Sequence, residues 1–230
     1  MEAILTDYDL YLKGFALTVG LVLVSGVASL VFGALLAAAR VGPIWVLSKA
    51  ASLYVTIFRN TPLLMVFIFV AIAMPRIGIT FKFVEEIAVG DWSISAFFFR
   101  ACVALTLYTS AFVCEAFRSG INAVPLGQAE AARALGLTFV QNMTNIVMPQ
   151  ALRAVVPPLT SVFIALTKNT SVAAAFGIAE ATSAMRTLGN RYGDQVVEIF
   201  FFIAIGYIVV VELLALGSYA LERRWKVAAR

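Results

Sequence analysis

Three ionisable side chains interrupt long apolar stretches of this 230-residue sequence: Arg59, Lys168 and Glu212. A charged group at membrane depth costs at least about 2.5–3.5 kcal/mol on insertion scales, so each side chain is a candidate for a transport function. The sequence contains no His, which excludes Ser/His/Asp and Cys/His catalysis and metal sites built on imidazole. We therefore expect no catalytic residues and no metal ligands, and any chemistry would be recognition within a membrane.

The first of these polar groups is Arg59-Asn60-Thr61-Pro62, about ten residues into an apolar run. Proline removes a backbone donor and can open a helix, and broken helices near the bilayer midplane are where many transporters expose backbone groups to substrate. Arg59, Asn60, Thr61 and Pro62 are therefore candidates for a substrate pathway. The alternative is that Arg59 is held by carbonyls of a neighbouring helix or by an acid, as a structural anchor.

The second group is Lys168-Asn169-Thr170, a polar notch in another apolar run with no acidic residue close to it in sequence. A buried ammonium repels cationic solutes, so a pathway lined by Lys168, Asn169 and Thr170 suits an anionic or amide amino acid better than a cationic one. The alternative is structural: Lys168 would reach the membrane surface or pair with Glu115 or Glu212. Glu212 itself is expected to face the bundle or a subunit interface.

Composition shows which elements must carry these groups. Hydrophobic residues make up 62% of the chain and charged residues 13%, whereas a soluble domain is about 45–50% apolar and about 25% charged. Membrane helices of about 20 apolar residues are the expected elements. We predict one all-α membrane domain over residues 1–230 with five transmembrane helices, at about Gly14–Ala39, Ala50–Met74, Ser95–Phe117, Ala154–Phe176 and Val196–Leu221.

Lys and Arg near the span ends predict the orientation, because they concentrate in cytoplasmic loops. With the N-terminus outside and the C-terminus in the cytoplasm, nine of the 17 Lys and Arg residues are cytoplasmic. They are Arg40, Lys49, Arg118, Arg133, Arg153, Arg223, Arg224, Lys226 and Arg230. This asymmetry accounts for the basic net charge of +4, and we expect the lipid bilayer, not nucleic acid, as the surrounding partner.

The segment between the third and fourth spans, residues 118–153, is expected to be a structured cytoplasmic loop. Pro125 and Gly127 indicate a turn, residues 128–135 are dense in strong helix formers, and Gly136 suits a left-handed helix end. A second short helix is expected near Thr138. The alanines would let the first helix lie close to another surface, with Glu130 and Arg133 as charged anchors. The plain alternative is an interfacial hairpin that covers the bundle.

An ordered set of motifs from about Leu10 to Leu221 resembles one family, the permeases of ABC importers. Glu130-Ala131-Ala132, with Gly136 after it, resembles the EAA loop of that family. The other matching segments are Phe58–Leu64, Glu115–Ile121, Val124–Gln128, Ile146–Pro149, Pro149–Arg153 and Lys168–Ser171. Within the family the chain is most similar to the polar-amino-acid branch, and there to actinobacterial glutamate permease subunits.

The resemblance implies a type I importer fold of the MetI-like kind, in which two permease subunits form the pathway. It also implies that the helix at about Gln128–Leu135 docks on a cytoplasmic ATPase dimer, with Glu130, Ala131 and Ala132 at the contact. The sequence has no Gly-x-x-x-x-Gly-Lys-Ser/Thr loop, so this chain should bind no cofactor, and ATP and Mg should belong to the partner ATPase.

The other implied partners are an extracytoplasmic amino-acid-binding protein and a homologous second permease, with a heterodimer expected over a homodimer. The substrate is expected to be glutamate, with glutamine or aspartate as alternatives.

Two other classes of function fit the sequence less well. An ion-coupled secondary transporter would use Glu212 as the coupling acid, but a five-span chain without an internal repeat is small for that task, and the loop would have no function. An intramembrane enzyme is disfavoured because no nucleophile and base pair is apparent.

Overall fold

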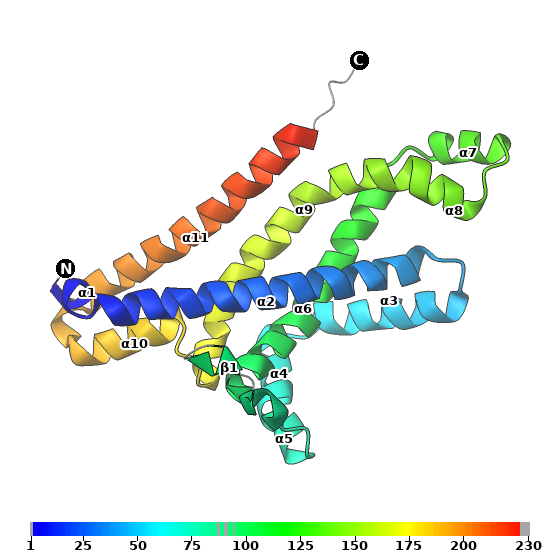
Figure 1. Cartoon of the computed structure of the whole chain (residues 1–230). Helices are drawn as coiled ribbons and strands as arrows, with labels where there is room; N and C mark the ends of the chain where they lie inside the picture. Colours follow the sequence, from blue (N-terminus) through cyan, green and yellow to red (C-terminus); the bar gives the residue numbers. More distant parts are fainter. Residues whose placement is uncertain (1, 87, 90–91, 94, 226–230) are drawn as a thin grey trace.

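The computed structural model describes residues 2–86, 88–89, 92–93 and 95–225. Long helices dominate this part of the chain (Figure 1), as the all-α prediction requires. The long helices are α2 (Tyr8–Val41), α3 (Trp45–Asn60), α6 (Ala96–Asn122), α9 (Met148–Asn169) and α11 (Val196–Trp225). Lys226 and Arg230, which belong to the predicted cytoplasmic cations, lie outside the described residues.

Shorter elements connect these helices. In the first part of the chain these are α1 (Glu2–Thr6), α4 (Leu63–Ile68), the π-helical turn η1 (Phe69–Ala73), α5 (Met74–Arg76) and the 3-10 turn η2 (Lys82–Glu86). Strands β1 (Ala88–Val89) and β2 (Trp92–Ser93) form a small antiparallel pair that the all-α prediction did not include. Later in the chain lie α7 (Leu126–Ala134), α8 (Phe139–Asn142), η3 (Met143–Val147), η4 (Thr170–Phe176), α10 (Ala181–Arg191) and η5 (Gly193–Gln195).

Helix α2 packs most extensively against α6, and α9 contacts both of these helices. The buried face of α2 is a row of small residues that includes Gly26, Ser29, Gly33 and Ala37. Small side chains let helix backbones approach closely where lipid gives no hydrophobic drive for association. The approach is tightest at Gly33, where an added Cβ would lie 2.6 Å from Val113 Cβ and 2.9 Å from the Ser110 carbonyl oxygen.

Four helices of the described chain are long and apolar enough to cross a membrane, and a fifth crossing is counted if one broken pair is a single span. The broken pair is Trp45–Asn60 with Leu63–Arg76, whose axes differ by 107°. The predicted second span is therefore not one straight helix. The chain changes direction at Pro62. Thr61 before it is extended, and Pro62 has no N–H to continue the hydrogen bonding of helix α3.

The helix that contains the predicted fourth span begins before the predicted start at Ala154. A helical path continues from Phe139 through η3 and α9 to Phe176, so the second half of the predicted loop and the span are one mechanical unit. The first half, α7, folds back beside it at one end of the molecule (Figure 1). The N-terminus, α1 and α10 lie at the opposite end.

Candidate functional site

The first candidate site is the hairpin of residues 126–142, which we call the α7–α8 hairpin. Helix α7 starts two residues before the predicted Gln128 and ends at Ala134, one residue before the predicted end. Its last turn is closed by two bonds, from Gly136 N to the Arg133 oxygen (2.9 Å) and from Leu137 N to the Ala132 oxygen (3.2 Å). Gly136 has φ +83°, so the predicted left-handed helix end is confirmed.

The second helix of the hairpin begins where the sequence predicts. Thr138 caps α8 by accepting a hydrogen bond from Gln141 N at 3.3 Å, and the Gln141 side chain accepts one from Thr138 N at 2.9 Å. The Asn142 amide donates to the Ala129 oxygen across the hairpin at 2.9 Å. These local bonds give the hairpin a defined shape that can be moved as one body.

The residues predicted to contact an ATPase differ in how exposed they are. Glu130, Ala131, Arg133 and Gly136 are exposed, as is Gln128, whose side-chain oxygen accepts a hydrogen bond from Gln150 of α9. Ala132 is only 5% exposed because it faces the rest of this chain. Its small size therefore serves the close packing of α7 in this structure.

Sequence reasoning missed the large apolar side chains at the ends of the hairpin helices. Leu126 is 79% exposed and Leu135 is 83% exposed, while Phe139 and Val140 of α8 are also exposed. The available signal was a leucine at each end of a helix otherwise made of alanine and polar residues. Large apolar side chains exposed next to polar ones can mark a docking surface.

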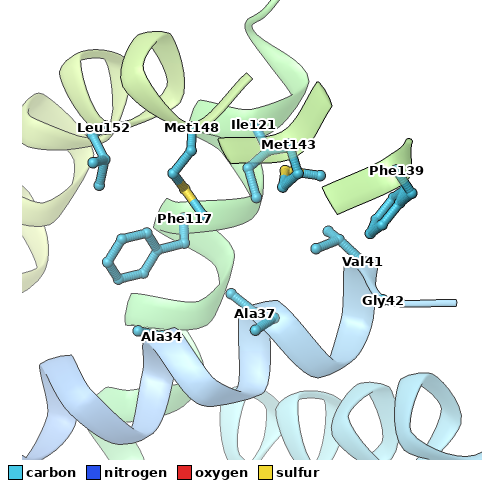
Figure 2. A pocket seen from close by; sticks show the side chains of 11 residues that line it. Ala34, Ala37, Val41, Gly42, Phe117, Ile121, Phe139, Met143, Met148 and Leu152 are labelled. Carbon is cyan, nitrogen blue, oxygen red and sulfur yellow. The ribbon is translucent and has the colours of Figure 1, made fainter. Parts of the chain in front are cut away.

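An apolar cavity of about 490 Å³ lies beneath the hairpin, between α2, α6 and the α8–α9 path. In Figure 2, Phe139 and Met148 extend from the α8–α9 side, and Ala37 and Val41 of α2 lie opposite. The hairpin is thus not close-packed on α2. Flexible methionine side chains at such a boundary can adapt when packed elements shift, so this space suits a movable joint.

The second candidate site surrounds Arg59 at the end of α3. Its guanidinium lies 3.4 Å from Glu115 of α6, so the alternative in which an acid holds Arg59 is the arrangement observed. Glu115 also contacts Arg40 of α2 and pairs with Arg118 at 3.4 Å. Three arginines on three helices therefore share one carboxylate, and the pairs with Arg40 and Arg59 join residues distant in sequence.

The residues around the helix break are open to the surroundings in this chain. Asn60 and Pro62 are exposed and Thr61 is half-buried. The Asn60 amide and the Thr61 hydroxyl each donate to a carbonyl four residues earlier, at 2.8 Å. These bonds use the carbonyls that the break would otherwise leave free, so the site is a well-formed turn with Arg59 beside it.

The three residues of the Lys168 group do not share one environment. Lys168 is exposed and makes no ion pair with Glu115 or Glu212 in the described chain, so the pairing offered as one structural alternative is not observed. Thr170 is fully buried and donates to the Thr167 oxygen at 2.7 Å. Asn169 lines a separate cavity between α6 and α9. The groups at Arg59 and at Lys168 therefore have different neighbours.

Glu180, a buried acid at the start of α10, was not predicted from the sequence to be a site residue. Glu180 is 0% exposed and begins α10, where one carboxylate oxygen accepts bonds from Thr182 N (2.9 Å) and Ser183 N (3.1 Å). The other oxygen accepts from Tyr207 of α11 at 2.7 Å. Every strong partner lies within this chain, so Glu180 joins elements and is not an open binding group.

Comparison with known proteins agrees with this arrangement. The family model for the inner membrane component of binding-protein-dependent transport systems matches residues 29–227. The glutamate transport system permease protein GluC of Corynebacterium glutamicum is 36% identical over 217 residues, which are 94% of each chain. The probable glutamine ABC transporter permease protein GlnP of Bacillus subtilis is 34% identical over 213 residues, 92% of this chain and 91% of that one.

Two solved structures support the fold. A crystal structure of an amino acid ABC transporter with histidines superposes with a TM-score of 0.83 and 26% identity, covering 96% of each chain. An inward-facing structure of the MetNI methionine ABC transporter has a TM-score of 0.72 at 23% identity, covering 96% of this chain and 99% of that one, and supports the MetI-like fold alone. The chain therefore belongs to the family of binding-protein-dependent transport system inner membrane components, as a multi-pass permease subunit of the amino-acid ABC importer type.

Proposed function

We propose that this chain is the membrane-spanning subunit of an ATP-driven importer of glutamate, with glutamine or aspartate as alternative substrates. The observation that carries the proposal is the α7–α8 hairpin, a hydrogen-bonded exposed unit that continues into a membrane helix. Such a unit can transmit movement from another protein. The similarity to a glutamate permease over 94% of the chain supports the substrate class.

In this proposal the hairpin docks in a groove of one subunit of a partner ATPase dimer, which binds ATP and Mg and performs the hydrolysis. Gln128, Glu130, Ala131, Arg133 and Gly136 form the contact, because all are exposed on the hairpin. The exposed leucines at the two ends of α7 border that polar centre. Ala132 contributes by letting α7 pack closely on its own chain.

The other partners are an extracytoplasmic amino-acid-binding protein and a homologous second permease, which we infer to be a different chain. The N-terminus lies outside and the C-terminus lies in the cytoplasm. Figure 1 supports this topology, because the N-terminus and the hairpin lie at opposite ends. The cytoplasmic end then carries Arg40, Arg118 and Arg133.

Transport would proceed by alternating access. Closure of the ATPase dimer pushes the hairpin, the continuous path from Phe139 to Phe176 transmits the push, and the apolar cavity beneath the hairpin gives room for it. The pathway then opens outward and receives the substrate from the binding protein. Hydrolysis returns it to the inward-facing state.

Arg59, Asn60, Thr61, Pro62, Lys168, Asn169 and Thr170 remain the proposed pathway group. The exposure of Lys168 and the position of Asn169 on a cavity support their inclusion. Replacing Lys168 or Arg59 by Met should raise the half-saturation concentration of uptake or abolish it. Unchanged uptake in both variants would remove these two cations from the pathway.

The test of the function is co-purification followed by reconstitution. The tagged chain should bring down a nucleotide-binding chain, and Glu130→Arg should weaken that association, whereas Lys13→Glu at the other end should not. Proteoliposomes with the complete complex should accumulate labelled glutamate only with ATP and binding protein. Solute movement by this chain alone down an ion gradient would refute the importer.

A further inference from the structure

The charges around Glu115 do not balance. Arg40, Arg59 and Arg118 all pair with this one carboxylate, and we call the four side chains the Glu115 cluster. One Glu115 oxygen contacts Arg40 and lies 3.4 Å from Arg59 Nη1, and the other oxygen lies 3.4 Å from Arg118 Nη1. The other ion pairs found among the described residues involve none of these side chains. Two of the three positive charges are therefore left without an acid.

The cluster is partly removed from water. The side chains of Arg40 and Glu115 are 15% and 25% exposed, and those of Arg59 and Arg118 are 48% and 44% exposed. Charges that lose water are stable only when they are paired and hydrogen-bonded. Each guanidinium has five N–H donors, and one carboxylate serves three of them. The cluster therefore keeps donors for a second anion.

A cavity of about 470 Å³ adjoins the cluster at the end of α6. It is lined by Glu115, Arg118, Ser119, Asn122 and Ala123. Arg118, Ser119 and Asn122 are exposed, so guanidinium, hydroxyl and amide donors border one space. The carboxylate in this lining is already shared by three arginines. An ammonium group would meet positive charge there, whereas an anion meets donors from three neighbouring residues.

The cluster lies near the depth of lipid headgroups. Helix α2 has 34 residues and a length of about 51 Å, which exceeds the roughly 30 Å of a hydrocarbon core. Arg40 ends the uncharged run that begins at Gly14 and is followed in α2 only by Val41. Basic pockets between membrane helices bind anionic headgroups at such a boundary. The planar guanidinium fork matches two oxygens of a phosphate group.

We propose that this cavity binds a phosphate group, which accepts hydrogen bonds from Arg118, Ser119 and Asn122, and that the charges of Arg40 and Arg59 strengthen the binding. Glu115 holds the guanidinium groups of three helices together beside the site. The depth of the cluster favours the phosphodiester of an anionic phospholipid, and free phosphate is the second source of the same group. The site does not depend on which solute the importer carries.

The first test measures lipid retention by native mass spectrometry. The purified complex, in detergent with equal amounts of phosphatidylglycerol and phosphatidylcholine, should retain phosphatidylglycerol. Arg118→Gln should weaken this retention about tenfold, the size of one hydrogen bond between charged groups. Arg224→Gln removes an exposed arginine at the end of α11 and is the matched control, which should retain the lipid as the wild type does. Equal losses in the two variants would indicate general attraction to cations and overturn the site.

A variant that keeps the charge separates a pocket from general attraction. Asn122→Ala removes one donor from the lining and should weaken phosphatidylglycerol retention about threefold. Asn190→Ala, at an exposed position of α10, should leave retention unchanged. Unchanged retention in Asn122→Ala together with unchanged retention in Arg118→Gln would place the lipid elsewhere and overturn the proposal.

A second measurement identifies the source of the phosphate. Thermal unfolding of the delipidated complex is followed with phosphatidylglycerol, phosphatidylcholine, sodium phosphate, sodium glutamate or sodium chloride, the salts at equal ionic strength. A rise in melting temperature that requires Arg118 and occurs only with phosphatidylglycerol identifies the lipid. A rise that also occurs with sodium phosphate identifies the phosphate group alone as the ligand. A rise with glutamate alone, or no rise that requires Arg118, would overturn the phosphate site.

Discussion

Replacing Gly33 of α2 by Ala should destabilise the protein, whereas the same replacement at Gly20 of α2 should not. A Cβ at position 33 would lie 2.5 Å from Val113 Cγ1, 2.6 Å from Val113 Cβ and 2.9 Å from a backbone oxygen of α6. A Cβ at position 20 meets only the ring of Phe98, at 3.7 Å. The two substitutions therefore share a helix and a chemical change and differ in packing.

The magnitude follows from the distances. Carbon atoms prefer separations of about 3.5–4.0 Å, so at Gly33 the two helices must separate by about 1 Å. Overpacking of this kind costs about 1–3 kcal/mol, while Gly to Ala within a helix gains about 1 kcal/mol. With overpacking at the upper end of that range, we expect a net loss of about 2 kcal/mol at position 33 and a gain of up to about 1 kcal/mol at position 20.

The assay is thermal unfolding of the purified chain, or of its complex, in one detergent. A loss of about 2 kcal/mol lowers the melting temperature of a chain of this length by about 4–8 °C. Gly20→Ala should melt at or slightly above the wild-type temperature. Equal melting temperatures for the two variants would refute the inference that contact of α2 and α6 at Gly33 determines stability.

Two further predictions concern Asp7, which precedes α2, and Glu180, which begins α10. The Arg191 guanidinium and then the Tyr192 hydroxyl lower the pKa of Asp7 below its ordinary value of 3.8. The stabilisation by this carboxylate is thus present above about pH 4 and is lost as the pH falls through the lowered pKa. Asp7→Asn should therefore have a lower melting temperature than the wild type at pH 7, and this difference in melting temperature should shrink below pH 4. A difference that stays constant with pH would contradict the prediction. Glu180→Leu removes the acceptor for two backbone N–H groups and for Tyr207, and each buried unpaired group costs about 1–3 kcal/mol. Glu180→Gln, which keeps one acceptor oxygen, should retain more folded protein in size-exclusion chromatography, and equal recovery of both would contradict the role of the oxygens.

Much of the hairpin was predictable because its signals are local. Gly136 takes the left-handed conformation that side chains disfavour, and Thr138 with Gln141 forms a capping box within four residues. Pro62 breaks its helix for an equally local reason. The angle of that break was not predictable, because it depends on what the helices on either side pack against.

The environments of the charged residues were only partly predictable. Arg59 pairs with Glu115, 56 positions later, and shares it with Arg40 of a third helix. Lys168 has the same type of apolar neighbours in sequence but is exposed and makes no ion pair with another described residue. A charge within a membrane is energetically unfavourable, so both residues are unusual. That argument does not determine which group pairs with each charge.

The sequence alone determined that this protein lies in a membrane, that its chain turns at Pro62 and Gly136, and which family it resembles. These properties depend on composition and on residues within a turn or two of one another. The tertiary structure decided that Ala132 is buried and that three arginines share Glu115. Those facts depend on how close α2, α6 and α9 approach, a distance set by side chains that are far apart along the chain.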